Sequence, residues 1–258
     1  MNISLLDVMF IYPPMIISSF FFMIIAYLFG SINTAIIVTK IVTKGGNIKE
    51  MGSGNAGFTN VLRCVGKVPA IVTIVCDFLK AVVASLVTYF LFPFVFQVAE
   101  YLVTSHCHSD LPINEMYMLR SIVMYLASLT CIIGHMFPIY FKFKGGKGVV
   151  AAIGMIAVLD WRVFLCVLGV FLIMFLITKI ISISSLLGAV LYGPFTFLIT
   201  YFFTYKPSLG TQNEISLEYV FIISIIALCT GLIVIIKHHE NIVRLIHGEE
   251  KKITAKKK

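Results

Sequence analysis

The side chains best suited to chemistry in this chain are small polar and basic groups interleaved with glycine. One run, GSGNAGFTN, occupies residues 52–60 and is followed by Arg63. Glycine lets backbone N–H groups turn toward an anion, and hydroxyl and amide side chains can donate hydrogen bonds to it. The run matches the pattern G-x-G-x-x-G without the preceding strand of a dinucleotide site, so it predicts an anion site or a flexible polar connection. Its candidate ligand residues are Gly52, Ser53, Gly54, Asn55, Asn60 and Arg63.

A second run, KFKGGKG at residues 142–148, ends directly before an apolar segment. The lysines supply positive charge, and the free N–H groups and macrodipole at the start of a helix point to the same place. Gly148 stands where a Walker loop would carry the Ser or Thr that binds magnesium. The run therefore favours phosphate binding without nucleotide machinery, whereas membrane topology would explain the lysines but not the paired glycines. Its candidate residues are Lys144, Gly145, Gly146, Lys147 and Gly148.

A hydroxyl cluster and a polar segment near the carboxyl end complete the set. Ser182 and Ser185 begin an apolar run, where serine can equally serve as packing material between helices. The segment HHENIVRLIHGEE at residues 238–250 places His238 and Asn241 at helical spacing. It can therefore extend a polar helical face beyond the last apolar run, or form a solvated end.

The composition defines the surroundings of these residues. Hydrophobic residues make up 59% of the 258-residue chain, charged residues only 12%, and the mean hydropathy is +1.00. Soluble domains carry about 25% charged residues, so a soluble fold is excluded. Long apolar runs, aperiodic glycine and positive charge confined to the short breaks between the apolar runs also exclude disorder, a collagen-like repeat and a nucleic-acid-binding module. The chain is predicted to be an all-α polytopic membrane protein that forms one domain over residues 1–258.

The apolar runs are long enough for seven transmembrane helices, since a helical span needs about 20 apolar residues. Most of the 20 Lys and Arg residues fall in alternate breaks, which places the amino terminus outside and the carboxyl terminus in the cytoplasm. The polar runs then all face the cytoplasm, and the basic tail at 251–258 contacts anionic lipid. The expected spans are 12–39, 68–99, 117–141, 182–205 and 219–236, with two short ones from the run 148–178, which is broken at Asp160–Arg162.

Two charged residues, Asp77 and Lys80, lie three positions apart inside the second span. A lone charge at mid-membrane costs about 2.5 to 3.5 kcal/mol, so we expect them to pair with each other or with the polar loops and to have a structural role. The six cysteines have no ligand-like spacing, and the sequence predicts no disulfide framework, metal site or cofactor.

Taken together, the polar blocks resemble the signatures of the bacterial membrane acyl-phosphate:glycerol-3-phosphate acyltransferases. In family order they read GSINTA at 30–35, GSGNAGFTNVLRCVG at 52–66, DFLK at 77–80, GHMFPIYFKFKGGKG at 134–148, SISS at 182–185 and HHENIVRLIHGEE at 238–250. The chain departs from the family pattern at Ala56, often Pro in members, and at His239, usually Arg.

The resemblance implies transfer of a fatty acyl group from acyl phosphate to the 1-hydroxyl of sn-glycerol 3-phosphate, giving lysophosphatidic acid at the cytoplasmic side of the inner membrane. It makes Ser53 and Arg63 essential site residues, the 144–148 loop a phosphate cradle, and His238 and Asn241 substrate contacts. It marks Glu250 as structural. The implied partners are the two substrates, the bilayer and the enzyme that supplies acyl phosphate.

The residue chemistry is compatible with this reaction. Acyl phosphate carries a good leaving group, so the enzyme must chiefly align the reactants and stabilise charge. We expect Arg63, Lys144 and Lys147 to bind phosphate, with Ser53, Asn55, Ser185 and Asn241 orienting the reactants; His238 or a substrate phosphate oxygen accepts the proton. The alternative is a transporter or channel for a phosphorylated solute, but we find no internal repeat, and the motifs gather at one face.

Overall fold

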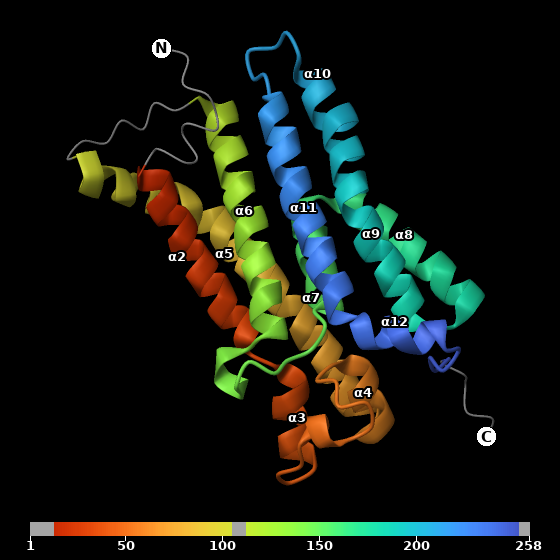
Figure 1. Cartoon of the computed structure of the whole chain (residues 1–258). Helices are drawn as coiled ribbons and strands as arrows, with labels where there is room; N and C mark the ends of the chain where they lie inside the picture. Colours follow the sequence, from red (N-terminus) through yellow and green to blue (C-terminus); the bar gives the residue numbers. More distant parts are fainter. Residues whose placement is uncertain (1–12, 105–111, 253–258) are drawn as a thin grey trace.

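A computed structural model describes residues 13–104 and 112–252, and over these ranges the chain is a bundle of helices without strands (Figure 1). Six helical stretches are long and apolar enough to cross a membrane. The main helices are α2 (Pro13–Ser31), α5 (Lys67–Thr104), α6 (Ile113–Met136), α8 (Trp161–Thr178), α9 (Ile181–Thr200) and α11 (Leu217–Lys237). Shorter elements connect them: α3 (Thr34–Val42), the 3-10 helices η1 (Ile48–Glu50) and η2 (Ile139–Phe141), α4 (Phe58–Cys64), α7 (Val149–Leu159), the π-helix η3 (Tyr201–Tyr205), α10 (Lys206–Ser208) and α12 (His239–Ile246).

The predicted break at Asp160 is confirmed, because α7 ends and α8 begins there. The Asp160 carboxylate accepts a hydrogen bond from the Arg162 N–H at 2.8 Å and forms a 2.6 Å ion pair with its guanidinium. Helix α7 has 11 residues, so it rises about 16 Å, roughly half of a hydrocarbon layer. The structure thus has six stretches of membrane length and one half-length helix, and the count of seven spans stays a prediction.

The first predicted span, 12–39, is interrupted near its end. Helix α2 stops at Ser31 and α3 starts at Thr34, with Asn33 accepting a hydrogen bond from the Ile36 N–H at 3.1 Å. The freed Ile32 carbonyl accepts a hydrogen bond from Lys80 Nζ at 2.8 Å. Side-chain partners therefore stabilise a break that hydropathy did not reveal.

The helices pack in two groups that α6 and α7 connect. Helix α2 contacts α5 and α6, α9 contacts α8 and α11, and α6 meets α11 while α7 meets α5 and α8. At the α2–α6 crossing the two backbones nearly touch: a Cβ on Gly30 would lie 2.0 Å from the Cys131 carbonyl oxygen, and one on Gly134 would lie 2.3 Å from that of Tyr27. Glycine is thus required at this crossing, as is common between membrane helices.

The polar connections lie at one end of the bundle. The segment from α3 to α4, the loop that precedes α7 and helix α12 are at the lower end of Figure 1, whereas α10 is at the opposite end. Only Lys251 and Lys252 of the predicted basic tail are within the described residues.

Candidate active site

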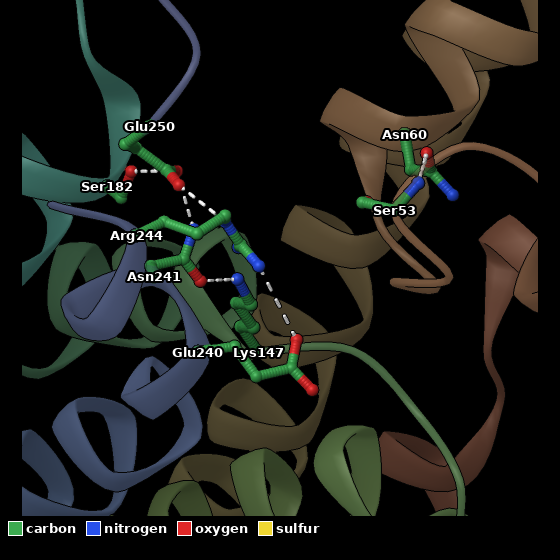
Figure 2. Close-up of polar contacts among 8 residues, drawn as sticks. All are labelled: Ser53, Asn60, Lys147, Ser182, Glu240, Asn241, Arg244 and Glu250. Atoms are coloured by element: carbon green, nitrogen blue, oxygen red, sulfur yellow. Dashed lines mark hydrogen bonds and ion pairs between the residues drawn. The ribbon is translucent and has the colours of Figure 1, made fainter. Parts of the chain in front are cut away.

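Glu250 is the centre of a polar cluster that joins three separate segments (Figure 2). Its carboxylate accepts hydrogen bonds from Ser182 Oγ at 2.5 Å, Asn241 Nδ2 at 2.6 Å and Arg244 Nε at 2.8 Å. Asn241 in turn accepts a hydrogen bond from Lys147 Nζ. The start of α9, helix α12 and the loop before α7 are therefore held together by side chains.

Local structure places each member of this cluster. Gly148 adopts a left-handed conformation with φ +77° and ends the glycine loop, so that α7 begins at Val149 with its first N–H groups free. Gly248, with φ +71°, turns the chain after α12 and returns Glu250 toward Asn241 and Arg244. Arg244 also forms a 3.9 Å ion pair with Glu240, which lies four residues before it on α12.

The cluster sets the protonation of its ionisable groups. Burial and the nearby Arg244 charge lower the pKa of Lys147 to about 8, although Glu250 and Glu240 oppose this shift. Burial would raise the pKa of Glu250, but the hydrogen bonds from Ser182, Arg244 and Asn241 outweigh it and lower the pKa. At neutral pH the site therefore combines a carboxylate with a lysine that is still mostly protonated and loses its proton as the pH rises through about 8.

His238 is buried between α11 and α12. Its Nδ1 lies 2.8 Å from the Val234 carbonyl oxygen, which can only accept, so the proton resides on Nδ1 and Nε2 keeps a lone pair. Burial, together with the Lys147 charge, lowers the His238 pKa to about 4, although the Val234 hydrogen bond opposes the shift. The neutral ring can thus accept a hydrogen bond from a substrate hydroxyl.

The glycine-rich run at 52–60 is organised by Asn60. The buried Asn60 side chain donates to the carbonyls of Ile48 and Met51 at 3.2 and 2.8 Å, and it accepts from the Ser53 N–H at 3.0 Å. Ser53 itself is exposed. Asn60 therefore shapes the loop, and the Ser53 hydroxyl is left accessible to a ligand.

This run lies against the glycine loop. A Cβ on Gly146 would lie 2.6 Å from the Ala56 carbonyl oxygen, and Lys49 Nζ donates to the Phe141 carbonyl at 3.4 Å. Lys49 and Lys144 are therefore close enough to interact where the loops meet. Burial and the Lys144 charge lower the pKa of Lys49. Within the described ranges, no hydrogen bond or ion pair joins the Ser53 loop to the Glu250 cluster, and the two are drawn apart in Figure 2.

A buried charged pair lies close to the glycine loop. The predicted pairing is present: Lys80 Nζ lies 2.8 Å from Asp77 Oδ1. Lys80 also lies 2.8 Å from His135 Nδ1, and a Cβ on Gly146 would lie 2.4 Å from His135 Nε2. His135 thus connects the charged pair to the glycine loop, a contact that spacing along the sequence could not reveal.

An apolar groove runs into the bundle next to the polar cluster. It encloses about 430 Å³, including its open mouth, between α7, α8, α9 and α11. Ser185 lines it, although the Ser185 hydroxyl donates to the Ile181 carbonyl of its own helix. The two predicted serines therefore have different surroundings: Ser182 contacts Glu250, and Ser185 lines the groove.

Among the described residues, several of the predicted site residues form no side-chain hydrogen bond or ion pair with either group. Arg63 is exposed on α4, and Lys144 is exposed in the loop before α7. Gly52 and Gly54 have positive φ values of 58° and 69°, which shape the Ser53 loop, and Asn55 lies beside Gly57. Among the residues that the structure describes, no group of three His, Cys, Asp or Glu side chains could hold a metal ion.

Fold and site together define a polytopic helical membrane protein with a polar, cation-containing centre beside an apolar groove. The family model for glycerol-3-phosphate acyltransferase matches residues 20–248. The glycerol-3-phosphate acyltransferase of Prochlorococcus marinus (strain MIT 9312) is 34% identical over 229 residues, which cover 89% of this chain and 94% of the relative.

Solved structures agree with this match. Crystal structures of PlsY (YgiH), an integral membrane glycerol 3-phosphate acyltransferase, in its glycerol 3-phosphate form and its lysphosphatidic acid form are 29% identical, with a TM-score of 0.66. Each covers 92% of this chain and 96% of the PlsY chain. The chain belongs to the glycerol-3-phosphate acyltransferase family and is an integral membrane acyltransferase.

Proposed function

We propose that the protein transfers a fatty acyl group from acyl phosphate to the 1-hydroxyl of glycerol 3-phosphate, forming lysophosphatidic acid and phosphate. The observation that carries the proposal is the position of the Lys147–Asn241–Glu250 cluster beside the mouth of an apolar groove. A cationic centre suits the phosphate groups of both substrates, and the groove suits a fatty chain. The glycerol 3-phosphate and lysphosphatidic acid forms of PlsY support the same acceptor and product.

The two loop groups divide the work in this proposal. Lys147 and Arg63 bind phosphate oxygens, and Lys144 and the free N–H groups at the start of α7 add positive potential. Ser53 and Asn241 orient the reactants across the space between the two groups. Glu250 fixes Asn241 and Arg244, so its role is structural.

The chemistry needs one bond exchange. The glycerol hydroxyl oxygen attacks the acyl carbonyl carbon, a new ester C–O bond forms, and the C–O bond to phosphate breaks with its electron pair leaving on the phosphate. The hydroxyl proton passes to His238 Nε2 or to a phosphate oxygen of the substrate. With a pKa of about 4, His238 is a weak base, which favours the phosphate oxygen as the final acceptor.

The proposed setting is the inner membrane, with the polar end facing the cytoplasm, where glycerol 3-phosphate is dissolved. The excess of Lys and Arg at this end supports that orientation. Acyl phosphate arrives from the enzyme that makes it, and its chain enters from the bilayer.

The test is an assay of the purified full chain in detergent with palmitoyl phosphate and labelled glycerol 3-phosphate. Formation of labelled lysophosphatidic acid without any coenzyme A thioester supports the proposal. Product formation only from palmitoyl coenzyme A overturns the acyl-phosphate donor. Uptake of glycerol 3-phosphate into proteoliposomes without product would instead support the transporter alternative.

A further inference from the structure

The apolar groove has a defined depth. Along α9 it is lined first by Ser185, near the polar end, then by Gly188 and Ala189, and last by Tyr192. Seven residues separate Ser185 from Tyr192, which corresponds to about 10 Å of helix. Val149 to Ile156 on α7 covers the same distance. The groove therefore begins at the polar cluster and ends at the level of Tyr192.

Tyr192 closes the deep end together with Ile156 and Val167. All three side chains are buried, Tyr192 being 3% exposed. The Tyr192 hydroxyl has no hydrogen-bond partner among the described residues, and it interacts electrostatically with the Asp160 carboxylate. The ring thus faces the groove while its polar atom faces the region of Asp160.

A polar cavity lies beyond this ring. It encloses about 330 Å³ and is lined by Asp160 and by hydroxyl groups from α6, α9, η3 and α11. It starts near Leu159, less than one helical turn past the last α7 residue of the groove. The hydroxyl-bearing lining residues are Tyr117, Ser121, Tyr125, Thr200, Thr204 and Tyr219.

The arrangement limits what the groove can hold. A methyl terminus in contact with the Tyr192 ring stays in apolar surroundings, but a longer chain would have to displace the ring or reach hydroxyl and carboxylate groups. Exposing those groups to hydrocarbon is unfavourable because they lose polar neighbours. The end of the groove is thus closed both by the volume of the ring and by the polarity behind it.

We propose that Tyr192 is a specificity-determining residue that sets the length of the acyl chain by forming the floor of the groove. The inference rests on the proposed function, since the occupant is the chain of the acyl phosphate substrate. The tyrosine ring supplies the wall, and its hydroxyl interacts electrostatically with Asp160, which lines the polar cavity.

The experiment compares kcat/KM for acyl phosphates from octanoyl to palmitoyl phosphate in the full chain, because the groove is only about 10 Å deep. Tyr192→Ala removes the wall, so the ratio of palmitoyl to octanoyl phosphate should rise by at least about tenfold, since the fit of even one methylene in an apolar pocket changes kcat/KM by about this factor. Tyr192→Phe keeps the wall, so its ratio should equal that of the wild type. Tyr219→Ala is the matched control: Tyr219 is equally buried at 3% and lines only the polar cavity, so the ratio should not move.

A second variant changes the groove halfway along. A Cβ on Gly188 would lie 3.4 Å from Val167 Cγ1, an ordinary contact, so Gly188→Ala should fold while narrowing the groove. Gly188→Ala should lower the ratio of kcat/KM for the longer to the shorter acyl phosphate. If Tyr192→Ala does not fold, this variant alone tests whether the groove sets the chain length.

The outcomes separate the two proposals. A wild-type chain that makes no product from any acyl phosphate overturns the proposed function, and the floor with it. An active enzyme whose chain-length ratio is unchanged in both Tyr192→Ala and Gly188→Ala has its acyl chain elsewhere, in the lipid, which overturns the floor alone. An equal rise of the chain-length ratio in Tyr219→Ala also overturns the role of Tyr192, because Tyr219 does not line the groove.

Discussion

At the scale of single residues, the site is built around shared hydrogen-bond partners. The Glu250 carboxylate accepts hydrogen bonds from Ser182, Asn241 and Arg244. Asn241 in turn accepts a hydrogen bond from Lys147. Hydrogen bonds to a charged group contribute about 1.5–3 kcal/mol each, so loss of this carboxylate should affect both stability and substrate binding.

We expect Lys147 to make glycerol 3-phosphate binding sensitive to alkaline pH. Its pKa of about 8 means that the ammonium is present below this value and lost as the pH rises through it. We expect kcat/KM for glycerol 3-phosphate to fall by about tenfold per pH unit above that pKa, since the protonated form binds phosphate. Lys147→Arg, which stays charged, should remove this fall. A wild-type profile that stays flat well above pH 8 would contradict the assignment.

Glu250→Gln tests the structural role of the cluster. The amide keeps the size but loses the charge that holds Arg244, so we expect a loss of about 2 kcal/mol of stability, together with a higher KM for glycerol 3-phosphate. The measurements are thermal unfolding in detergent and steady-state kinetics. Glu249→Gln is the control, because Glu249 is adjacent and exposed; equal effects in the two variants would show that the cluster contributes nothing specific.

At the scale of elements, backbone contacts between helices position the loops. Helices α2 and α6 cross at Gly30 and Gly134, and the next residue after Gly134 is His135, which contacts the glycine loop. The same crossing brings the Tyr27 hydroxyl to the Phe137 carbonyl, to which it donates at 2.8 Å. The distance between these two helices therefore determines where the glycine loop begins.

Gly134→Ala should disrupt this crossing. The new Cβ would lie 2.3 Å from the Tyr27 carbonyl oxygen, so the helices must separate, at a cost of about 1–3 kcal/mol. Gly169→Ala on α8 is the matched control: apart from the adjacent backbone of its own helix, nothing lies within 4 Å of its Cβ position, and alanine favours the helix. Thermal unfolding should show a loss for the first variant and none for the second. Equal melting temperatures in both would show that the crossing can relax.

At the scale of the whole molecule, the polar loops and the mouth of the apolar groove lie at one end of the bundle. The Ser53 loop, the glycine loop and α12 come from three distant parts of the chain, and all lie at that end (Figure 1). The half-length helix α7 begins at the glycine loop and lines the groove, so it connects the polar loops to the apolar groove.

Labelling with an impermeant thiol reagent tests the proposed orientation. In a cysteine-free background, the single variants Ser53→Cys, Lys144→Cys and Glu249→Cys, all at exposed positions of the three segments, should react from the cytoplasmic side only. Gln212→Cys, in the exposed segment after α10, should react from the opposite side. Reaction of the first three positions from opposite sides of the bilayer would make a single active centre impossible.

The sequence by itself determined the membrane class, the break at Asp160, the pairing of Asp77 with Lys80 and the family. Hydropathy, helical spacing and motif order carry this information because they are local or periodic along the chain. Only the tertiary structure revealed the α2–α3 break, the contact of His135 with the glycine loop, the three partners of Glu250 and the ring of Tyr192 at the end of the groove. These features depend on which helix faces meet, and close approach between distant segments leaves no spacing signal in one sequence.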